Sequence, residues 1–166
     1  MKKLILIISS TIFLSFSTYI DTRKIEKDGV SLEFPSDWDI MKMEGYPILV
    51  QEKAKTPEYS PLCNFVVEFD YKNIEIENYI NNLKDKFKNS PYMKDWKVIS
   101  ERKIKFKGLE AKEIITTCIA ANFMFKTKII IVKKNNRIIN LNTSSSIEEY
   151  ENNKTITNKI YQSVKF

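Results

Sequence analysis

Four extended segments follow one another in the second half of the chain, and they constrain the fold more than any other feature of the sequence. They cover residues 97–107, 109–121, 123–133 and 137–143. Gly108 and the pair Asn135 and Asn136 lie between segments and favour tight turns. Because strands joined by tight turns pair in opposite directions, this region predicts an antiparallel meander.

The first half of the chain adds shorter strands. Residues 23–34 form two extended pieces separated by Asp28 and Gly29, a dipeptide that suits a hairpin turn. A further short strand is expected at residues 48–51, and a loop is expected at 52–60. These elements supply the additional strands that a sheet of ordinary size requires.

Residues 63–71 alternate clearly between apolar and polar side chains. One face carries Cys63, Phe65, Val67 and Phe69, and the other carries Asn64, Glu68 and Asp70. Alternation with a period of two is typical of a half-buried strand, so we expect the polar face to meet solvent.

Two segments have the apolar spacing of helices. Residues 74–89 place an apolar side chain every three or four residues, and Asn73 is expected to be the N-cap. Near the C-terminus, Ser145 and Glu148 have the spacing of a capping box. The apolar residues that follow predict a second helix that closes the chain.

The N-terminus has the pattern of an export signal. Lys2 and Lys3 precede an apolar run of residues 4–16, which is too short to span a membrane as a helix. We expect residues 1–17 to be a cleaved signal peptide, and an uncleaved anchor that extends to about residue 20 is the alternative. Residues 18–166 are then expected to form a single domain.

The charge of the mature chain is modest. Cleavage after residue 17 would lower the formal net charge from +6 to +4. The sequence has no arginine-rich tract and no aromatic stacking motif, and nucleic acid is not the usual partner of an exported protein, so we expect no nucleic-acid partner. Contact with a membrane is expected only through an uncleaved signal or through weak electrostatic attraction.

The two cysteines leave two possibilities open. An oxidising compartment would permit a disulfide between Cys63 and Cys118. However, both lie in apolar, strand-like segments, where a buried free thiol is the common alternative. Neither cysteine follows the signal, so the chain has no acceptor for the lipid of a bacterial lipoprotein.

The sequence contains no histidine, which removes the commonest general base and metal ligand. Catalytic systems that pair serine or cysteine with histidine are therefore impossible within this chain. Two cysteines alone cannot complete a zinc site, and three glycines do not form a phosphate-binding loop. We expect no catalytic residues, no metal site and no cofactor, and therefore no enzyme.

Several residues are candidates for binding, each with a structural alternative. Glu68 and Asp70 share one face of a strand, where we expect them to be solubilising rather than catalytic. Trp38 is expected in the core, whereas Trp96 and its neighbour Tyr92 could anchor a partner from an exposed loop. A further basic face could attract anions or could simply protect a sheet edge, and it comprises Lys103, Lys105 and Lys107.

Two segments resemble the PsbP-like family. The run DGVSLEFPSDW at residues 28–38 is similar to the opening hairpin of that family, which places an aromatic-Pro-x-x-Trp turn after its first full strand. The segment 138–150 is similar to its final strand, which leads through threonine and serine residues into a closing helix. The resemblance extends over most of residues 24–166.

The resemblance implies an α+β fold: an α/β/α sandwich with a curved antiparallel sheet of about six to seven strands flanked by two main helices. The same fold is found in a eukaryotic Ran-binding import factor and in many exported bacterial proteins. Plant members assist the oxygen-evolving photosystem, but no metal or chloride motif of theirs can be placed on this sequence. We therefore transfer the fold and not the photosynthetic role.

These features predict an exported, non-enzymatic accessory domain, outside the cell or in its envelope. Its expected partner is another exported or envelope protein. The alternative is a carrier or sensor of a small apolar or anionic ligand, held between the sheet and a helix.

Overall fold

The computed structural model describes residues 21–54 and 63–166, so the predicted signal peptide and most of the predicted loop at 52–60 lie outside the described residues. The elements are β1 (Thr22–Lys27), β2 (Val30–Pro35), β3 (Asp39–Ile40), β4 (Ile48–Gln51), β5 (Cys63–Asp70), α1 (Ile76–Lys88), β6 (Lys94–Phe106), β7 (Leu109–Ala120), β8 (Phe123–Lys134), β9 (Arg137–Ser146) and α2 (Tyr150–Ser163).

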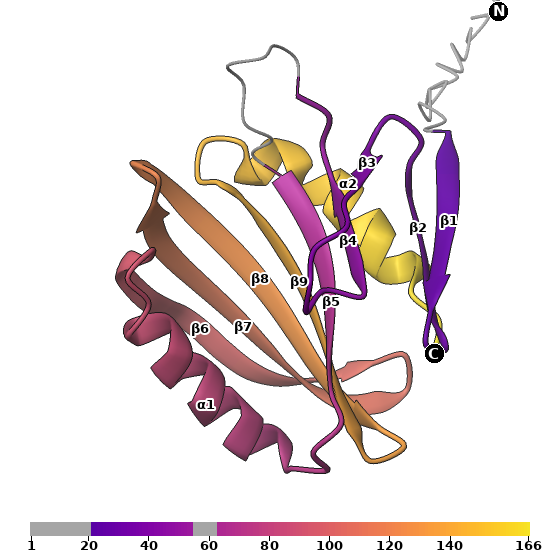
Figure 1. Cartoon of the computed structure of the whole chain (residues 1–166), viewed down its shortest axis with the longest axis vertical. Coiled ribbons are helices and arrows are strands. Elements are labelled where there is room, and N and C mark those ends of the chain that lie inside the picture. The colour runs from indigo at the N-terminus through magenta and orange to yellow at the C-terminus, as the bar shows by residue number, and fades with distance from the viewer. Residues whose placement is uncertain (1–20, 55–62) are drawn as a thin grey trace, which may run out of the picture.

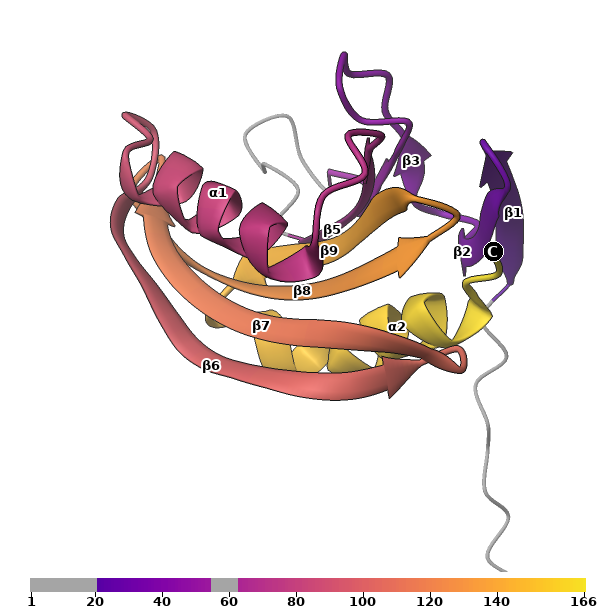
Figure 2. The ribbon, with the colours of Figure 1, turned by 90° about the horizontal axis from the view of Figure 1, so that it is seen from below.

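Seven strands form one antiparallel sheet in the order β3-β4-β5-β9-β8-β7-β6, and β1 pairs with β2 in a separate hairpin. The run from β6 to β9 is the predicted meander. The last strand of the meander, β9, lies in the middle of the sheet and also pairs with β5. The long strands β6, β7 and β8 bend around α1 (Figures 1 and 2).

Each face of the sheet is covered by one helix, because the central strands are apolar on both sides. On β8, Ile129 and Ile131 pack with Ile80 and Leu83 of α1. The alternate residues of the same strand, such as Ile130, belong to a larger cluster with α2 and the β1–β2 hairpin. The expected α/β/α sandwich with two main helices is confirmed.

Helix α2 is fixed to the sheet and to the hairpin. Tyr161 is almost fully buried, and its hydroxyl donates a hydrogen bond of 2.8 Å to the carbonyl of Lys128. Just after the helix, Lys165 and Ser31 exchange two backbone hydrogen bonds of 2.8 and 2.9 Å. Trp38 is 3% exposed in this cluster, which confirms its expected place in the core.

Three predicted boundaries were wrong. Helix α1 has Glu75 and not Asn73 at its N-cap, because Asn73 adopts a left-handed turn with a φ of 44°. Strand β9 extends through Ser146, so Ser145 lies inside a strand and the predicted capping box does not form. Strand β6 begins at Lys94, which places Trp96 in a strand and not in a loop.

The order of the strands separates the two cysteines. The disulfide that the sequence permits is therefore not formed. Cys63 and Cys118 are both free and buried. Cys63 lies on β5 and Cys118 on β7, with β9 and β8 between them. Three strand spacings amount to about 14 Å, whereas disulfide-bonded residues have Cα atoms less than about 7 Å apart.

Candidate functional site

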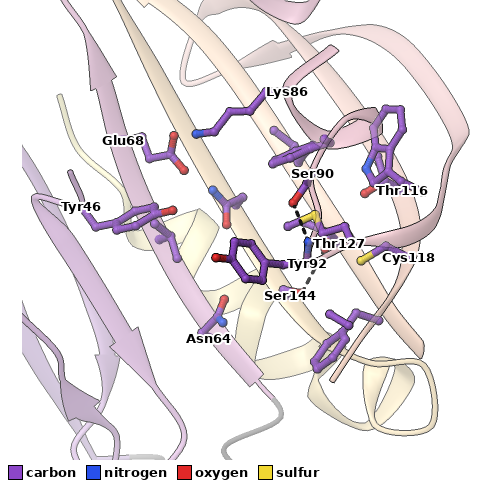
Figure 3. Close-up of a pocket in the computed structure, with 18 of the residues that line it drawn as sticks. Tyr46, Asn64, Glu68, Lys86, Ser90, Tyr92, Thr116, Cys118, Thr127 and Ser144 are labelled. Carbon is purple, nitrogen blue, oxygen red and sulfur yellow. Dashed lines mark hydrogen bonds between the residues drawn. The ribbon is translucent and has the colours of Figure 1, made fainter. Parts of the chain in front are cut away.

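A cavity of about 690 Å³ lies between the sheet and the C-terminal end of α1 (Figure 3). Helix α1 ends at Lys88, and Pro91 in the following loop cannot continue it. The helix therefore covers only part of its face of the sheet, and the remaining part becomes the floor of the cavity. The side chains of β4, β5, β7, β8 and β9 line this floor.

A row of neutral polar side chains crosses the floor from strand to strand. The strand register pairs Gln51 with Asn64, Asn64 with Ser144, Ser144 with Thr127, and Thr127 with Thr116. All five residues line the cavity. We call Gln51, Asn64, Ser144, Thr127 and Thr116 the polar row.

One member of the polar row has an unused hydrogen-bonding atom. The hydroxyl of Thr127 donates a hydrogen bond of 3.0 Å to Ser144 Oγ. Asn64 Oδ1 is buried and accepts no hydrogen bond. A buried carbonyl oxygen without a donor raises the free energy of the folded chain, by about 1–3 kcal/mol in typical cases.

The charged groups of the cavity lie near one end of the polar row. Glu68 of β5 and Lys86 of α1 point toward each other, with Tyr46 nearby (Figure 3). Burial raises the pKa of the Glu68 carboxyl, although the charge of Lys86 and a hydrogen bond from Asn142 lower it. Burial and the neighbouring Glu68 also raise the pKa of the Tyr46 hydroxyl.

The other end of the cavity is apolar and aromatic. The rings of Phe87 and Trp96 are in contact, with centroids 5.9 Å apart. Irregular pairing between Lys94 and Lys97 interrupts the alternation of β6 next to Trp96, and bulges of this kind re-aim side chains. The thiol of Cys118 also lines this end, together with Met93, Phe125 and Ile129.

Two of the surface residues singled out from the sequence lie at this site, and the others do not. Trp96 lines the cavity, and Tyr92 lines its mouth while 82% exposed. The lysine face, which comprises Lys103, Lys105 and Lys107, lies exposed on the edge strand β6 and its turn and does not line the cavity.

Glu68 and Asp70, the two carboxylates expected on one solvated face, lie in different surroundings. Glu68 lines the cavity and is not on a solvated face as expected, because the β3–β4 segment and α1 flank its side of the sheet. Asp70 accepts a hydrogen bond of 2.8 Å from the backbone of Lys72 and does not line the cavity. In the part of the chain that the structure describes, no group of three or more acidic or cysteine side chains could hold a metal ion.

Five polar residues that line the cavity were not predicted as candidates from the sequence, namely Asn64, Asn142, Ser144, Thr127 and Thr116. The signal was present in β9, where polar residues alternate with Ile139 and Leu141. A strand in the middle of a covered sheet is normally apolar on both faces, so polar residues there indicate a cavity or a buried network.

Comparisons with known proteins support the fold. The model for "PsbP-like protein" matches residues 8–166. The structure is similar to CyanoP, the cyanobacterial PsbP from Synechocystis sp. PCC 6803, with a TM-score of 0.65 and 8% identity, covering 90% of this chain and 95% of that chain. No curated protein matches the sequence.

Two further structures have similar scores. LpqN from Mycobacterium tuberculosis, described as involved in cell envelope biogenesis, has a TM-score of 0.60 and 14% identity over 88% of this chain and 90% of its own. The Ran-binding protein Mog1p from Saccharomyces cerevisiae has a TM-score of 0.60 and 5% identity over 89% and 96%. At such identities the structures show a shared fold alone, but the family model extends over nearly the whole sequence. The chain therefore belongs to the PsbP-like protein family.

Proposed function

We propose that this chain is an exported, non-enzymatic binding domain that takes a small amphipathic molecule into the cavity between its sheet and α1. The observation that carries this proposal is the cavity itself, whose volume of about 690 Å³ lies within the range of sites for small molecules. An aromatic and aliphatic wall with a few polar groups is also typical of such sites.

The composition of the cavity favours binding over catalysis. Glu68 and Lys86 are the charged side chains that line it. Burial raises the pKa of the Cys118 thiol, which disfavours the nucleophilic thiolate. The sequence supplies no histidine that could act as a general base. A site of this kind can hold and release a molecule but lacks a paired nucleophile and base.

Export is supported by the apolar run at the N-terminus, which has the length of a signal sequence. The fold is shared with LpqN, a protein described as involved in cell envelope biogenesis. In residues 21–54 and 63–166, the structure has no helix that is long and apolar enough to cross a membrane.

Binding of an exported or envelope protein is the second candidate function. The rim of the cavity exposes Tyr92 by 82% and Met43 by 57%, and exposed apolar side chains beside a cavity are typical of contact surfaces. Crosslinking in native envelope or extracellular extracts, followed by capture, should recover one stoichiometric partner. Loss of that partner from a Tyr92→Ser variant, but not from a Tyr71→Ser variant, would locate the contact at the rim.

The binding of a fluorescent apolar probe tests the first proposal. We expect N-phenyl-1-naphthylamine to bind the purified chain at a single saturable site with a rise in fluorescence. Trp96→Ala should weaken binding about tenfold, because it removes the main aromatic wall of the cavity, worth about 1–2 kcal/mol.

Ile99→Ala is the matched control, since Ile99 lies on the same strand, is 58% exposed and does not line the cavity. Absence of saturable binding, or equal weakening by both substitutions, would contradict the proposal.

A further inference from the structure

We propose that the molecule bound in this cavity is an amphipathic amine, whose protonated amino group pairs with the carboxylate of Glu68. Its apolar body then lies against the wall formed by Phe87 and Trp96. This inference rests on the proposed function and narrows the ligand to cations that carry an apolar chain or ring.

Two glutamates on the sheet differ in their counterions. Glu113 of β7 is 7% exposed and has two cations beside it, Arg102 at 2.6 Å and Lys128 at 3.4 Å. Glu68 of β5 is half-buried, and in the described residues no lysine or arginine nitrogen lies within 4.0 Å of its carboxylate. Since a desolvated charge is costly without a partner, the unpaired carboxylate favours binding of a cation from outside the chain.

The pKa values of the two carboxyls follow the same contrast. Burial raises the pKa of Glu68 by more than the charge of Lys86 lowers it. Burial also acts on Glu113, but Arg102 and Lys128 outweigh it and lower the pKa of that carboxyl. An ammonium group beside Glu68 would act on it as Arg102 and Lys128 act on Glu113.

The carboxylate of Glu68 is open to the cavity. Its side chain lines the cavity and points toward Lys86 (Figure 3). In the described residues three side-chain atoms are buried without a hydrogen-bond partner, and neither oxygen of Glu68 is among them. A bound ammonium group can therefore reach this carboxylate.

The two charges of the cavity differ in how firmly they are held. Lys86 is exposed in the last turn of α1, where the helix dipole also favours a lysine. Its long side chain can turn into water, whereas Glu68 is held on a strand in the floor of the cavity. A ligand therefore meets a fixed negative charge and a movable positive charge, which favours a cation over an anion.

The surroundings of Glu68 suit an amine with an apolar body. An ammonium group has three N–H donors, and the hydroxyl oxygen of Tyr46 near Glu68 offers a second acceptor (Figure 3). Phe87 follows Lys86 directly in α1, and its ring contacts Trp96. The apolar wall of the cavity therefore begins beside its charged end.

Competition between ligands of equal chain length tests the charge of the head group. N-phenyl-1-naphthylamine bound to the full chain is displaced by decylammonium, decan-1-ol or decanoate, each below the concentration at which it forms micelles. At about pH 7 the amine is a cation and the acid is an anion. We expect decylammonium to displace the probe at a concentration at least about fivefold lower than decan-1-ol, because it gains a hydrogen bond between charged groups. Decanoate should be the weakest of the three.

Two matched substitutions assign this preference to Glu68. Glu68→Gln should keep the probe bound and reduce the preference for decylammonium over decan-1-ol to less than about twofold. Asp70→Asn makes the same change of charge on the same strand, and it should leave the preference unchanged because Asp70 does not line the cavity. Circular dichroism checks that both variants fold.

A third substitution separates the two charges of the cavity. Lys86→Gln should keep or increase the preference for decylammonium, because it removes the cation that competes for Glu68. A preference that is lost in Lys86→Gln would contradict the proposed pairing.

The outcomes distinguish failure of this inference from failure of the proposed function. If decan-1-ol or decanoate displaces the probe as well as decylammonium does, the cavity binds but the ligand is not an amine. If Glu68→Gln retains the full preference, Glu68 is not the counterion. If the probe itself does not bind, the proposed function fails together with the inference.

Discussion

The pKa of the Glu68 carboxyl depends on how the cavity buries this side chain. Burial raises its pKa, and this effect outweighs the opposing charge of Lys86 and the hydrogen bond from Asn142. A carboxyl whose pKa is higher in the folded chain than in the unfolded chain favours folding at low pH. That contribution is lost as the pH rises through the folded-state pKa.

Glu68→Gln should therefore raise the free energy of unfolding at about pH 7, where the wild-type carboxylate is desolvated. The gain should shrink as the pH falls to about 4, where the carboxyl in the wild type is protonated. Urea unfolding at several pH values measures this difference. Glu110→Gln serves as the control, because Glu110 is exposed on β7. A gain that persists unchanged at low pH would contradict a desolvated Glu68.

At this scale the sequence predicted which face of a strand a side chain occupies but not what covers that face. The alternation of residues 63–71 correctly placed Glu68 opposite Phe69. It could not show that α1 and the β3–β4 segment, which follow and precede this strand in the chain, flank the same side of the sheet. For the same reason the sequence predicts a solvated Asn64, and its buried, unpartnered oxygen is visible only in three dimensions.

At the scale of elements, the order of the strands decides the state of the cysteines. Cys63 and Cys118 lie three strands apart, so we expect two free thiols even in protein made in an oxidising compartment. Burial, with a smaller contribution from Glu52, raises the pKa of Cys63 to about 12, so its thiol should also react slowly in the folded chain.

Alkylation with iodoacetamide and measurement of intact mass test this arrangement. In denaturant without a reducing agent, both cysteines should be modified. Without denaturant, modification of Cys63 should be slower by orders of magnitude. A mass that shows no alkylation until a reductant is added would demonstrate a disulfide and contradict the strand order.

The elements themselves could be predicted because their signals are local. Turn residues such as Gly108 and Asn135 marked the meander, and apolar spacing marked both helices. The ends of elements were less predictable, because pairing between strands decides them. Strand β9 continues to Ser146, which pairs with Phe125 of β8. Likewise Asn73 enters a left-handed turn, which leaves Glu75 as the helix N-cap.

At the scale of the whole molecule, the two faces of the sheet differ in how completely they are covered. Helix α2, the hairpin and the C-terminal residues close one face, where Tyr161 and Val164 are buried. Helix α1 buries Ile80 and Leu83 on the other face, and the sheet beyond its last turn forms the floor of the cavity. One side therefore stabilises the fold, and the other leaves space for a ligand.

Native mass spectrometry of the chain purified from the cells that make it tests the central claim, that this cavity holds a small amphipathic molecule. We expect one additional small mass per chain, which is lost on denaturation and is absent from Trp96→Ala protein prepared in the same way. A wild-type chain with the mass of the polypeptide alone under native conditions, or a Trp96→Ala variant that keeps the same bound mass, would contradict binding of a small molecule in this cavity.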